Sequence, residues 1–354
     1  MGLGESVFDL CYLVLVIGMG ARLVLEKNKN AKLFGIMAIL LGAGDAFHLI
    51  PRVISHLSPG GFEANALSLS YGKMVTGITM TIFYLLYYFY YREISKETSA
   101  GKKWIIIILS IVRIVLVLLP QNNWSGGGSY TMGIVRNIPF LVMGVLLMLW
   151  SFEKRKVDGL KHMGLLIFLS FLFYVPVVLW VDKVPALGAL MMPKTVAYVF
   201  IVVEGLKHFI KDFNADNLFN MTITYGVMGL CGGVFYREFT KYYAYTDATH
   251  LGKLHVHTLV LGMVVMTIFY LLLKNSDKEK LKQLKRPLNI YNTGIVFTVA
   301  NMMLIGISEV VSEGSPVVSK AAMDGVSGIG HIILGVGFIY TLIKIKNSQP
   351  AHQI

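Results

Sequence analysis

Apolar stretches of about 20 residues recur eleven times along the 354-residue chain, and each is long enough to cross a bilayer as an α-helix. Only 15% of the residues are charged, against about 25% in ordinary soluble chains, and the mean hydropathy is +0.64. The chain is therefore predicted to be an all-α, polytopic transmembrane protein in contact with the lipid bilayer. The expected spans cover residues 8–25, 33–51, 69–91, 104–120, 131–152, 162–181, 186–210, 217–237, 254–273, 288–310 and 325–344.

The basic residues predict which way the chain crosses the membrane. With the N-terminus outside, the short inner loops hold 22 of the 32 Lys and Arg residues. Cytoplasmic loops collect such residues, so the predicted orientation is N-out and C-in. The net charge of +12 follows from these loops, and we expect no nucleic-acid partner.

A short polar segment divides the predicted spans into two groups. Residues 213–217 read FNADN, with seven spans before them and four after. We therefore expect residues 1–213 to form a seven-helix module and residues 214–354 to form a four-helix bundle.

Two segments of the second group place histidines within spans. LGKLHVHTLVLGM carries His255 and His257, and GVSGIGHIILGVG carries His331. Both spans run from outside to inside, and the second and fourth helices of a sequential bundle lie on a diagonal. This arrangement predicts haem b held between His255 and His331, with both histidines ligating the iron.

Helical spacing groups the candidate cofactor-binding residues on two faces. The first face carries His255, Thr258, Gly262 and Met266, and the second carries Gly328, His331 and Gly335. A glycine one turn from a ligand histidine leaves room for a porphyrin. His257 lies on the opposite face of its helix, so His255 is favoured as the iron ligand.

These histidine segments resemble parts of the large subunit of haem-copper oxidases and nitric oxide reductases. LHVHTLVLGM resembles the segment whose first histidine ligates the low-spin haem, which maps to His255, with a following glycine that maps to Gly262. GHIILGVG resembles a haem-ligating helix and maps one ligand to His331. The second histidine of that helix is Ile333 here, and the copper-binding histidines have no counterpart. The resemblance therefore implies a low-spin haem without an oxygen-reducing centre.

The C-terminal segment as a whole is more closely similar to an uncharacterised bacterial membrane family. The similarity rests on YREFTKYY, the HxHT element and the GHIxLGxG pattern. That family has no established activity to carry over. The expected location is the plasma membrane of a bacterial-type cell.

Two other interpretations of the histidines stay open. Histidines near helix ends also serve packing and hydrogen bonding, and glycine-rich faces also serve close helix packing. A metal site is a third interpretation, which would recruit His250, Glu309 or Glu313 at the outer rim.

The first seven spans contain an excess of basic residues at membrane depth. The candidate ligand-binding residues are Asp45, His48, Arg52, Lys73, Arg113, Arg136 and Lys194. Charges at that depth pair with one another or line a water-filled cavity. The basic excess favours an anionic ligand, such as a carboxylate, a phosphate headgroup or haem propionates. If the C-terminal bundle holds haem, we expect this half to bind a quinone or another anionic partner near the outer face. The alternative is that Asp45 pairs with one cation while the others reach the outer interface.

Three functions are compatible with these features. The first, which the sequence favours over the other two, is electron transfer or sensing by haem b in the C-terminal bundle. The second is transport or export of an anionic small molecule or lipid through the seven-span module. The third is a ligand sensor that acts with a partner membrane protein. The sequence has no GxSxG, P-loop or dinucleotide motif, so no hydrolase or nucleotide site is expected.

Overall fold

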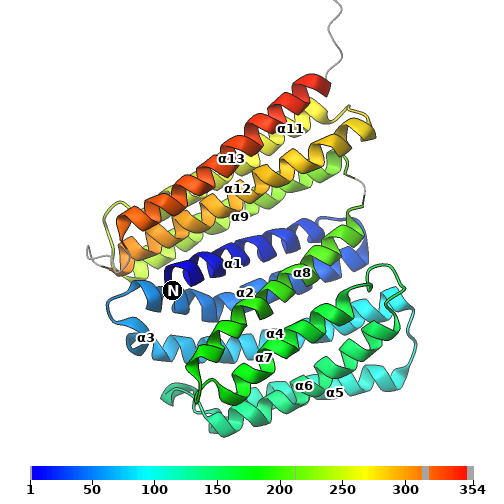
Figure 1. The fold of residues 1–354 in the computed structure, drawn as a ribbon, viewed down its shortest axis with the longest axis vertical. Coiled ribbons are helices and arrows are strands. Elements are labelled where there is room, and N and C mark those ends of the chain that lie inside the picture. Colours follow the sequence, from blue (N-terminus) through cyan, green and yellow to red (C-terminus); the bar gives the residue numbers. More distant parts are fainter. Residues whose placement is uncertain (1, 212, 313–318, 349–354) are drawn as a thin grey trace, which may run out of the picture. The chain divides into compact units, whose positions relative to one another are not determined.

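The computed structural model describes residues 2–211, 213–312 and 319–348 of the chain, and all regular elements in these ranges are helices (Figure 1). The α-helices are α1 (Gly2–Val24), α2 (Lys29–Leu57), α3 (Gly61–Ala64), α4 (Ala66–Ser95), α5 (Ala100–Leu118), α6 (Tyr130–Glu153), α7 (Met163–Trp180), α8 (Met191–Phe209), α9 (Ala215–Tyr242), α10 (His250–His257), α11 (Val265–Leu273), α12 (Lys278–Val311) and α13 (Lys320–Ser348). Short 3-10 helices follow α5 at Pro120–Asn122 and Trp124–Gly126 and precede α8 at Pro185–Leu190.

The helices are long and apolar enough to cross a membrane many times. In the described ranges, nine helical segments meet that test, and a tenth does so if α5 and the bent segment after it count as one span. That segment, 120–126, turns by 64° from α5. The prediction of an all-helical, multi-pass membrane protein is therefore confirmed. The count of eleven spans and the N-out, C-in orientation stay predictions.

The helix α4 covers the predicted span 69–91 but is less apolar than its neighbours because it is rich in tyrosine. Tyr84, Tyr87, Tyr88, Tyr90 and Tyr91 are all buried. The hydroxyls of three of them have partners on other segments. Tyr84 shares a hydrogen bond with Ser170 Oγ at 3.1 Å, Tyr87 shares one with Ser151 Oγ at 2.7 Å, and Tyr90 donates one to the carbonyl of Gly159 at 2.9 Å. The tyrosines therefore make α4 an interior helix.

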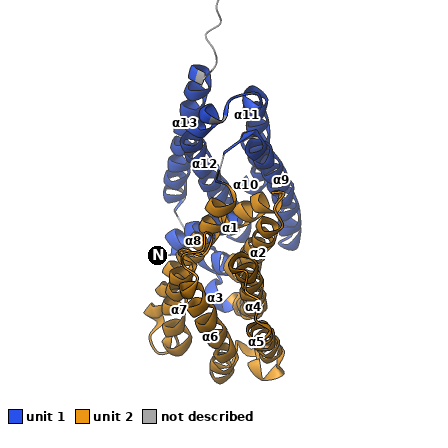
Figure 2. Cartoon of the chain, turned by 90° about the vertical axis from the view of Figure 1, so that its right-hand side faces the viewer, with its two compact units in different colours: residues 1–14, 52–63, 211–354 blue, residues 15–51, 64–210 orange. Residues whose placement is uncertain are grey.

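The chain divides into two compact units (Figure 2). Unit 1 comprises residues 1–14, 52–63 and 211–354, and unit 2 comprises residues 15–51 and 64–210. The helices α1 and α2 contribute to both units, and within α2 the division falls between Pro51 and Arg52. Assignment of residues 1–213 and 214–354 to separate functional modules stays a prediction.

In unit 1, α12 is the central helix. It packs against α13 along its length and against α10, which in turn packs against α9 (Figure 1). Glycines allow the close approach of α13: a Cβ on Gly294 would lie 2.5 Å from the backbone of Leu334, and one on Gly337 would meet the backbone of Tyr291. The buried face of α12 includes Leu284, Leu288 and Tyr291.

A π-helix, η4 (Thr258–Val264), joins α10 to α11. The wide turn is supported by the hydroxyl of Tyr291, which donates a hydrogen bond to the carbonyl of Leu261 at 2.6 Å. Residues at every fourth position are buried along this segment, namely Leu254, Thr258, Gly262 and Met266. His255 therefore lies one position away from the fully buried row.

In unit 2, successive helices from α4 to α8 pack against their neighbours in chain order. An aromatic cluster fills the space between them, with Tyr84 against Phe140 and Phe171 at ring-centroid distances of 5.3 and 5.6 Å. A Cβ on Gly144 would collide with the Phe171 ring, so this glycine is required for the close packing of α6 and α7. The charged side chains described below lie among these rings.

Candidate functional site: a buried cationic centre and a row of histidines

Arg113 is buried in the interior of unit 2. It lies on α5, its exposed fraction is 3%, and its guanidinium carbon is 3.3 Å from the centroid of the Phe140 ring. One terminal nitrogen, Nη2, donates a hydrogen bond to Asn137 Oδ1 at 3.3 Å. The buried Nε and Nη1 have no hydrogen-bond partner among the residues that the structure describes. Because guanidinium nitrogens only donate, a ligand here must supply acceptors.

Lys194 on α8 is also buried, with an exposed fraction of 6%. Its Nζ lies over two tyrosine rings, 5.0 Å from the Tyr174 centroid and 5.1 Å from the Tyr198 centroid. Asp45 attracts this ammonium group electrostatically and Arg113 repels it. Two cations and one carboxylate therefore interact within the same interior.

Hydrogen bonds and cation–π contacts together link these groups into one cluster. Tyr174 donates from its hydroxyl to Asn137 Oδ1 at 2.9 Å, the same oxygen that accepts from Arg113. Tyr198 and Tyr84 have their hydroxyl oxygens 3.4 Å apart. We call Arg113, Asn137, Tyr174, Lys194 and Tyr198 the cationic centre. Its members come from α5, α6, α7 and α8.

Arg136 lies beside this centre but has strong partners of its own. Its Nη1 donates to Asn122 Oδ1 at 2.6 Å, and its guanidinium carbon is 4.4 Å from the Trp124 centroid. Asn122 is fully buried, and its amide donates to carbonyls at the end of α5, including that of Leu119 at 2.9 Å. Arg136 therefore holds the broken end of α5 in place.

The remaining predicted residues of the first seven spans do not gather at the cationic centre as one set. Arg52 belongs to unit 1, where it forms an ion pair with Glu5 of α1 and lies over the Phe62 ring. Lys73 is exposed on α4. His48 lies on α2 in unit 2 with its Nδ1 buried. Of the acidic and basic residues predicted together, Asp45, Arg113 and Lys194 share one electrostatic environment.

A groove opens between α6 and α7 next to the cationic centre. Its walls are almost entirely apolar and include Asn137 and Tyr174 of that centre. The lining residues are Ile134, Asn137, Ile138, Phe140, Leu141, Phe171, Tyr174, Val175, Val178 and Leu179. Ile138 and Leu141 are exposed, so the groove reaches the outer surface of unit 2.

The predicted haem residues lie in unit 1. His331 is exposed on α13, and its Nδ1 donates to the carbonyl of Ser327 at 2.8 Å. His257 makes the equivalent bond to Lys253, at 3.0 Å. His255 is half-buried beside Gly233 of α9, and its buried Nδ1 has no hydrogen-bond partner in the part of the chain that the structure describes.

The three predicted porphyrin-facing glycines have different surroundings. A Cβ on Gly262 would lie 2.5 Å from Cγ of Tyr225, so that space is filled by the tyrosine ring. No described atom lies within 4 Å of a Cβ built on Gly328 or on Gly335. Open space therefore flanks His331 on its own helix, whereas the space at Gly262 serves packing.

The two proposed iron ligands lie at different levels along α12. Leu251 of α10 meets Gly306, which places His255 near position 302 of α12. Gly330 of α13 meets Thr298, which places His331 near position 297. At 1.5 Å per residue the two levels differ by roughly 7 Å. Both side chains would have to bridge that offset to share one iron.

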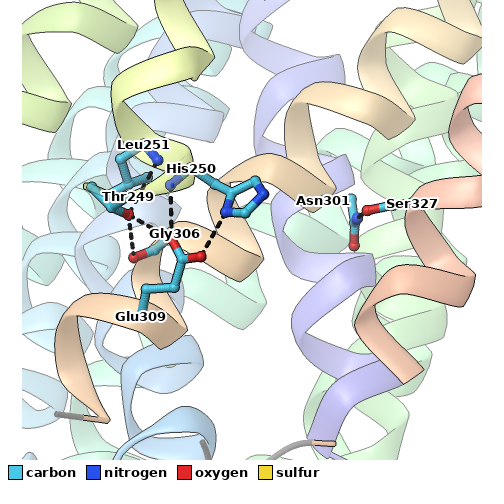
Figure 3. Close-up of polar contacts among 7 residues, drawn as sticks. All are labelled: Thr249, His250, Leu251, Asn301, Gly306, Glu309 and Ser327. Carbon is cyan, nitrogen blue, oxygen red and sulfur yellow. Dashed lines mark hydrogen bonds and ion pairs between the residues drawn. The ribbon is translucent and has the colours of Figure 1, made fainter. Parts of the chain in front are cut away.

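His250 and Glu309, two residues of the metal interpretation, are brought together at the start of α10 (Figure 3). His250 Nδ1 lies 2.6 Å from Glu309 Oε1, while the backbone N–H of His250 and the hydroxyl of Thr249 donate to Oε2. The carboxylate thus caps the positive end of α10. Glu313 lies outside the described residues. Within those residues, no three His, Cys, Asp or Glu side chains are arranged to hold a metal ion.

Several residues of these clusters were not predicted from the sequence. Glu5 was missed because its partner Arg52 is 47 positions away. Asn137 lies one position after the predicted Arg136, and Tyr174 lies within the apolar run FLFYVPVVLW. The position of Asn137 directly after a basic residue within a predicted span is a usable signal, whereas the span around Tyr174 contains no Lys or Arg that would mark it.

The fold and the apolar helices define an integral, multi-pass membrane protein. Residues 216–348 match the model of a family described as "Protein of unknown function (DUF2871)". This match confirms the predicted kinship of the C-terminal segment with an uncharacterised family. No curated protein and no solved structure matches the chain. The resemblance to haem-copper oxidases is not shown by these comparisons.

Proposed function

We propose that unit 2 binds the anionic group of a small molecule or lipid at the cationic centre, as the substrate site of a membrane transporter. The observation that carries this proposal is Arg113, which is buried with two guanidinium nitrogens lacking partners among the described residues. A buried donor without a partner costs about 1–3 kcal/mol, and a charge at the bilayer centre costs about 3 kcal/mol more. A bound carboxylate or phosphate offsets both costs.

Lys194 supports the same proposal. Its burial beside Arg113 places two positive charges in one interior, and Asp45 supplies one attracting carboxylate. An anion adds attraction to both cations and weakens their mutual repulsion. The aromatic rings under Arg113 and Lys194 hold them by cation–π contacts, which leaves the N–H groups free to donate.

The test measures anion binding by detergent-purified protein, with the apparent Tm as the readout. Thermal unfolding is recorded in the presence of acetate, succinate, inorganic phosphate or palmitate. Wild-type protein should gain apparent Tm with at least one anion, and Arg113→Met and Lys194→Met should lose that gain. The control is Lys183→Met, which removes an exposed cation from the turn after α7. Uptake of the active anion into proteoliposomes then tests transport. If no anion gives an Arg113-dependent gain, the proposal is wrong.

Haem b between His255 and His331 is a second candidate. Its favourable observation is that the Nδ1–H of His331 bonds a backbone carbonyl, which leaves Nε2 available as a metal ligand beside the open space at Gly328 and Gly335. The test is a reduced-minus-oxidised visible spectrum of protein expressed with ample haem. Low-spin bands that disappear in both His255→Ala and His331→Ala would support it, and a colourless protein would exclude it.

A further inference from the structure

We infer that the ligand of the cationic centre is an amphiphile: a single acyl chain lies in the α6–α7 groove and its anionic head, a carboxylate or a phosphate, reaches Arg113. This inference rests on the proposed function and names the class of substrate. It follows from three features of unit 2, namely the continuity of groove and centre, the composition of the walls, and the two prolines beside them.

The groove and the cationic centre share residues. Asn137 and Tyr174 line the groove, and they are hydrogen-bonded to each other through the oxygen that also accepts from Arg113. Phe140 lines the groove as well, and Arg113 stacks on its ring. A molecule in the groove is therefore one side chain away from the unpartnered guanidinium nitrogens.

The walls of the groove fit a hydrocarbon chain. Eight of the ten lining residues are aliphatic or phenylalanine, and those on α7 extend from Phe171 to Leu179. The rise between these two positions of the helix is about 12 Å, which corresponds to several methylene groups. At the mouth of the groove, Ile138 is 55% exposed, and in a membrane such a side chain faces lipid. An acyl chain can therefore enter sideways from the bilayer.

Both walls contain a proline inside the helix. Pro139 lies in α6 and Pro176 lies in α7, each within the stretch that lines the groove. Proline has no backbone N–H and its ring displaces the preceding turn, so it bends a helix where it occurs. Each proline removes one intrahelical hydrogen bond, so the two walls can separate locally at this point. This accounts for an opening here although Gly144 allows close packing one turn further along α6.

The alternative occupant is an ordinary bilayer lipid that fills an apolar surface without recognition of its head. The charge beside the groove argues against it, because Arg113 and Lys194 add a positive field that a neutral head does not use. The cationic centre therefore favours an anionic head group, and the groove favours an acyl chain.

The experiment measures binding of tritiated palmitate to the full-length protein in phosphatidylcholine nanodiscs. The test variant Ile138→Trp fills the mouth of the groove, and Val178→Trp fills it from the other wall. The matched control is Leu149→Trp, also on α6 and also exposed, but outside the groove. Arg113→Met tests whether the protein recognises the anionic head group of the ligand. Hexadecyl phosphate, hexadecanol, acetate and inorganic phosphate are the competitors, and melting curves confirm that each variant is folded.

The expected result is saturable palmitate binding that is lost in Arg113→Met, weakened roughly tenfold or more by either groove variant, and unchanged in Leu149→Trp. Hexadecyl phosphate should compete and hexadecanol should not. If acetate or phosphate binds through Arg113 while the groove variants leave palmitate binding unchanged, the amphiphile inference is overturned and the proposed function stands. If palmitate binding survives Arg113→Met, the head is not recognised and the inference is overturned. If no anion binds through Arg113, both fail.

Discussion

The guanidinium of Arg113 stacks on the ring of Phe140, with its central carbon 3.3 Å from the ring centroid. This contact accounts for how a cation is tolerated in the interior of unit 2 although its Nε and Nη1 have no partner among the residues that the structure describes. The ring face carries partial negative charge and meets the cation without a hydrogen bond. Arg113 is thus held by its flat face, while its edge remains available to acceptors.

The stack predicts how substitutions of Arg113 affect stability. Methionine keeps an apolar side chain against Phe140 and removes the unpartnered donors. Arg113→Met should therefore leave the free energy of unfolding unchanged or raise it by up to about 1–3 kcal/mol. Alanine leaves a cavity over the ring, so Arg113→Ala should lower it. Thermal unfolding without ligand measures both. Equal loss in the two variants would mean that the guanidinium itself is a structural requirement.

Two glycines of the predicted haem site should respond oppositely to alanine. Gly262→Ala places a Cβ 2.5 Å from Cγ of Tyr225 and should destabilise the protein by about 1–3 kcal/mol. Gly328→Ala meets no described atom within 4 Å and should be neutral or stabilising by about 0.5–1 kcal/mol, because alanine favours a helix. Comparison of the two apparent Tm values checks this. A Tm loss in Gly328→Ala would show that another molecule occupies that space.

Tyr291 should be required for the wide turn of η4. Tyr291→Phe removes the hydrogen bond to the carbonyl of Leu261, at an expected cost of about 1 kcal/mol. Hydrogen exchange should accelerate in the amides of Thr258–Val264. The control is Tyr270→Phe on α11, where no hydroxyl hydrogen bond is found within the described ranges. Unchanged exchange in Tyr291→Phe would show that packing alone maintains the turn.

The turn between α4 and α5 should be weaker in acid. The Lys102 ammonium donates to Glu97 Oε2 at 2.7 Å and the Ser99 backbone N–H donates to Oε1, and these hydrogen bonds lower the pKa of the Glu97 carboxyl. Because the folded pKa lies below the unfolded value, the stabilisation is complete above the unfolded pKa and is lost as pH falls through the folded pKa. Exchange of the amides of residues 97–102 between pH 7 and pH 3 measures it.

Glu97→Gln should abolish that pH dependence, because glutamine does not titrate. The matched control is Glu93→Gln, which changes an exposed carboxylate one turn earlier on α4. A turn that loosens in acid to the same extent in Glu97→Gln would indicate that other groups are responsible.

The sequence was sufficient to predict the helical, membrane-spanning character, because runs of 20 apolar residues have few other folds. It also identified Arg113 and Lys194 as interior cations. It did not identify what surrounds them, because the partners Asn137, Phe140 and Tyr174 come from other helices. A single sequence does not show which helices pack against one another. The pairing of Arg52 with Glu5 was missed for the same reason.

The position of His255 relative to the buried residues of its span depends on a feature that the sequence pattern does not show. The prediction that His255 shares a face with Gly262 and Met266 assumes 3.6 residues per turn throughout. The structure has a π-helix from Thr258 to Val264, and its wider turns give a buried row that begins at Leu254. Nothing in the local sequence TLVLGMV marks that change, because the supporting hydroxyl of Tyr291 is 30 positions away.

The π-helix between α10 and α11 also sets the direction of the side chains before it relative to those after it. Each residue of an α-helix advances the side chain by about 100°. If this segment relaxed to ordinary α-helical turns with all its residues kept, His255 would rotate by about that angle relative to Met266 and Phe269, whereas deletion of one residue between Thr258 and Val264 would nearly restore the present orientation. Among related chains, a one-residue gap at this point would therefore mark molecules in which an unbroken α-helix replaces η4 and the span presents nearly the same side chains to α9 and α12.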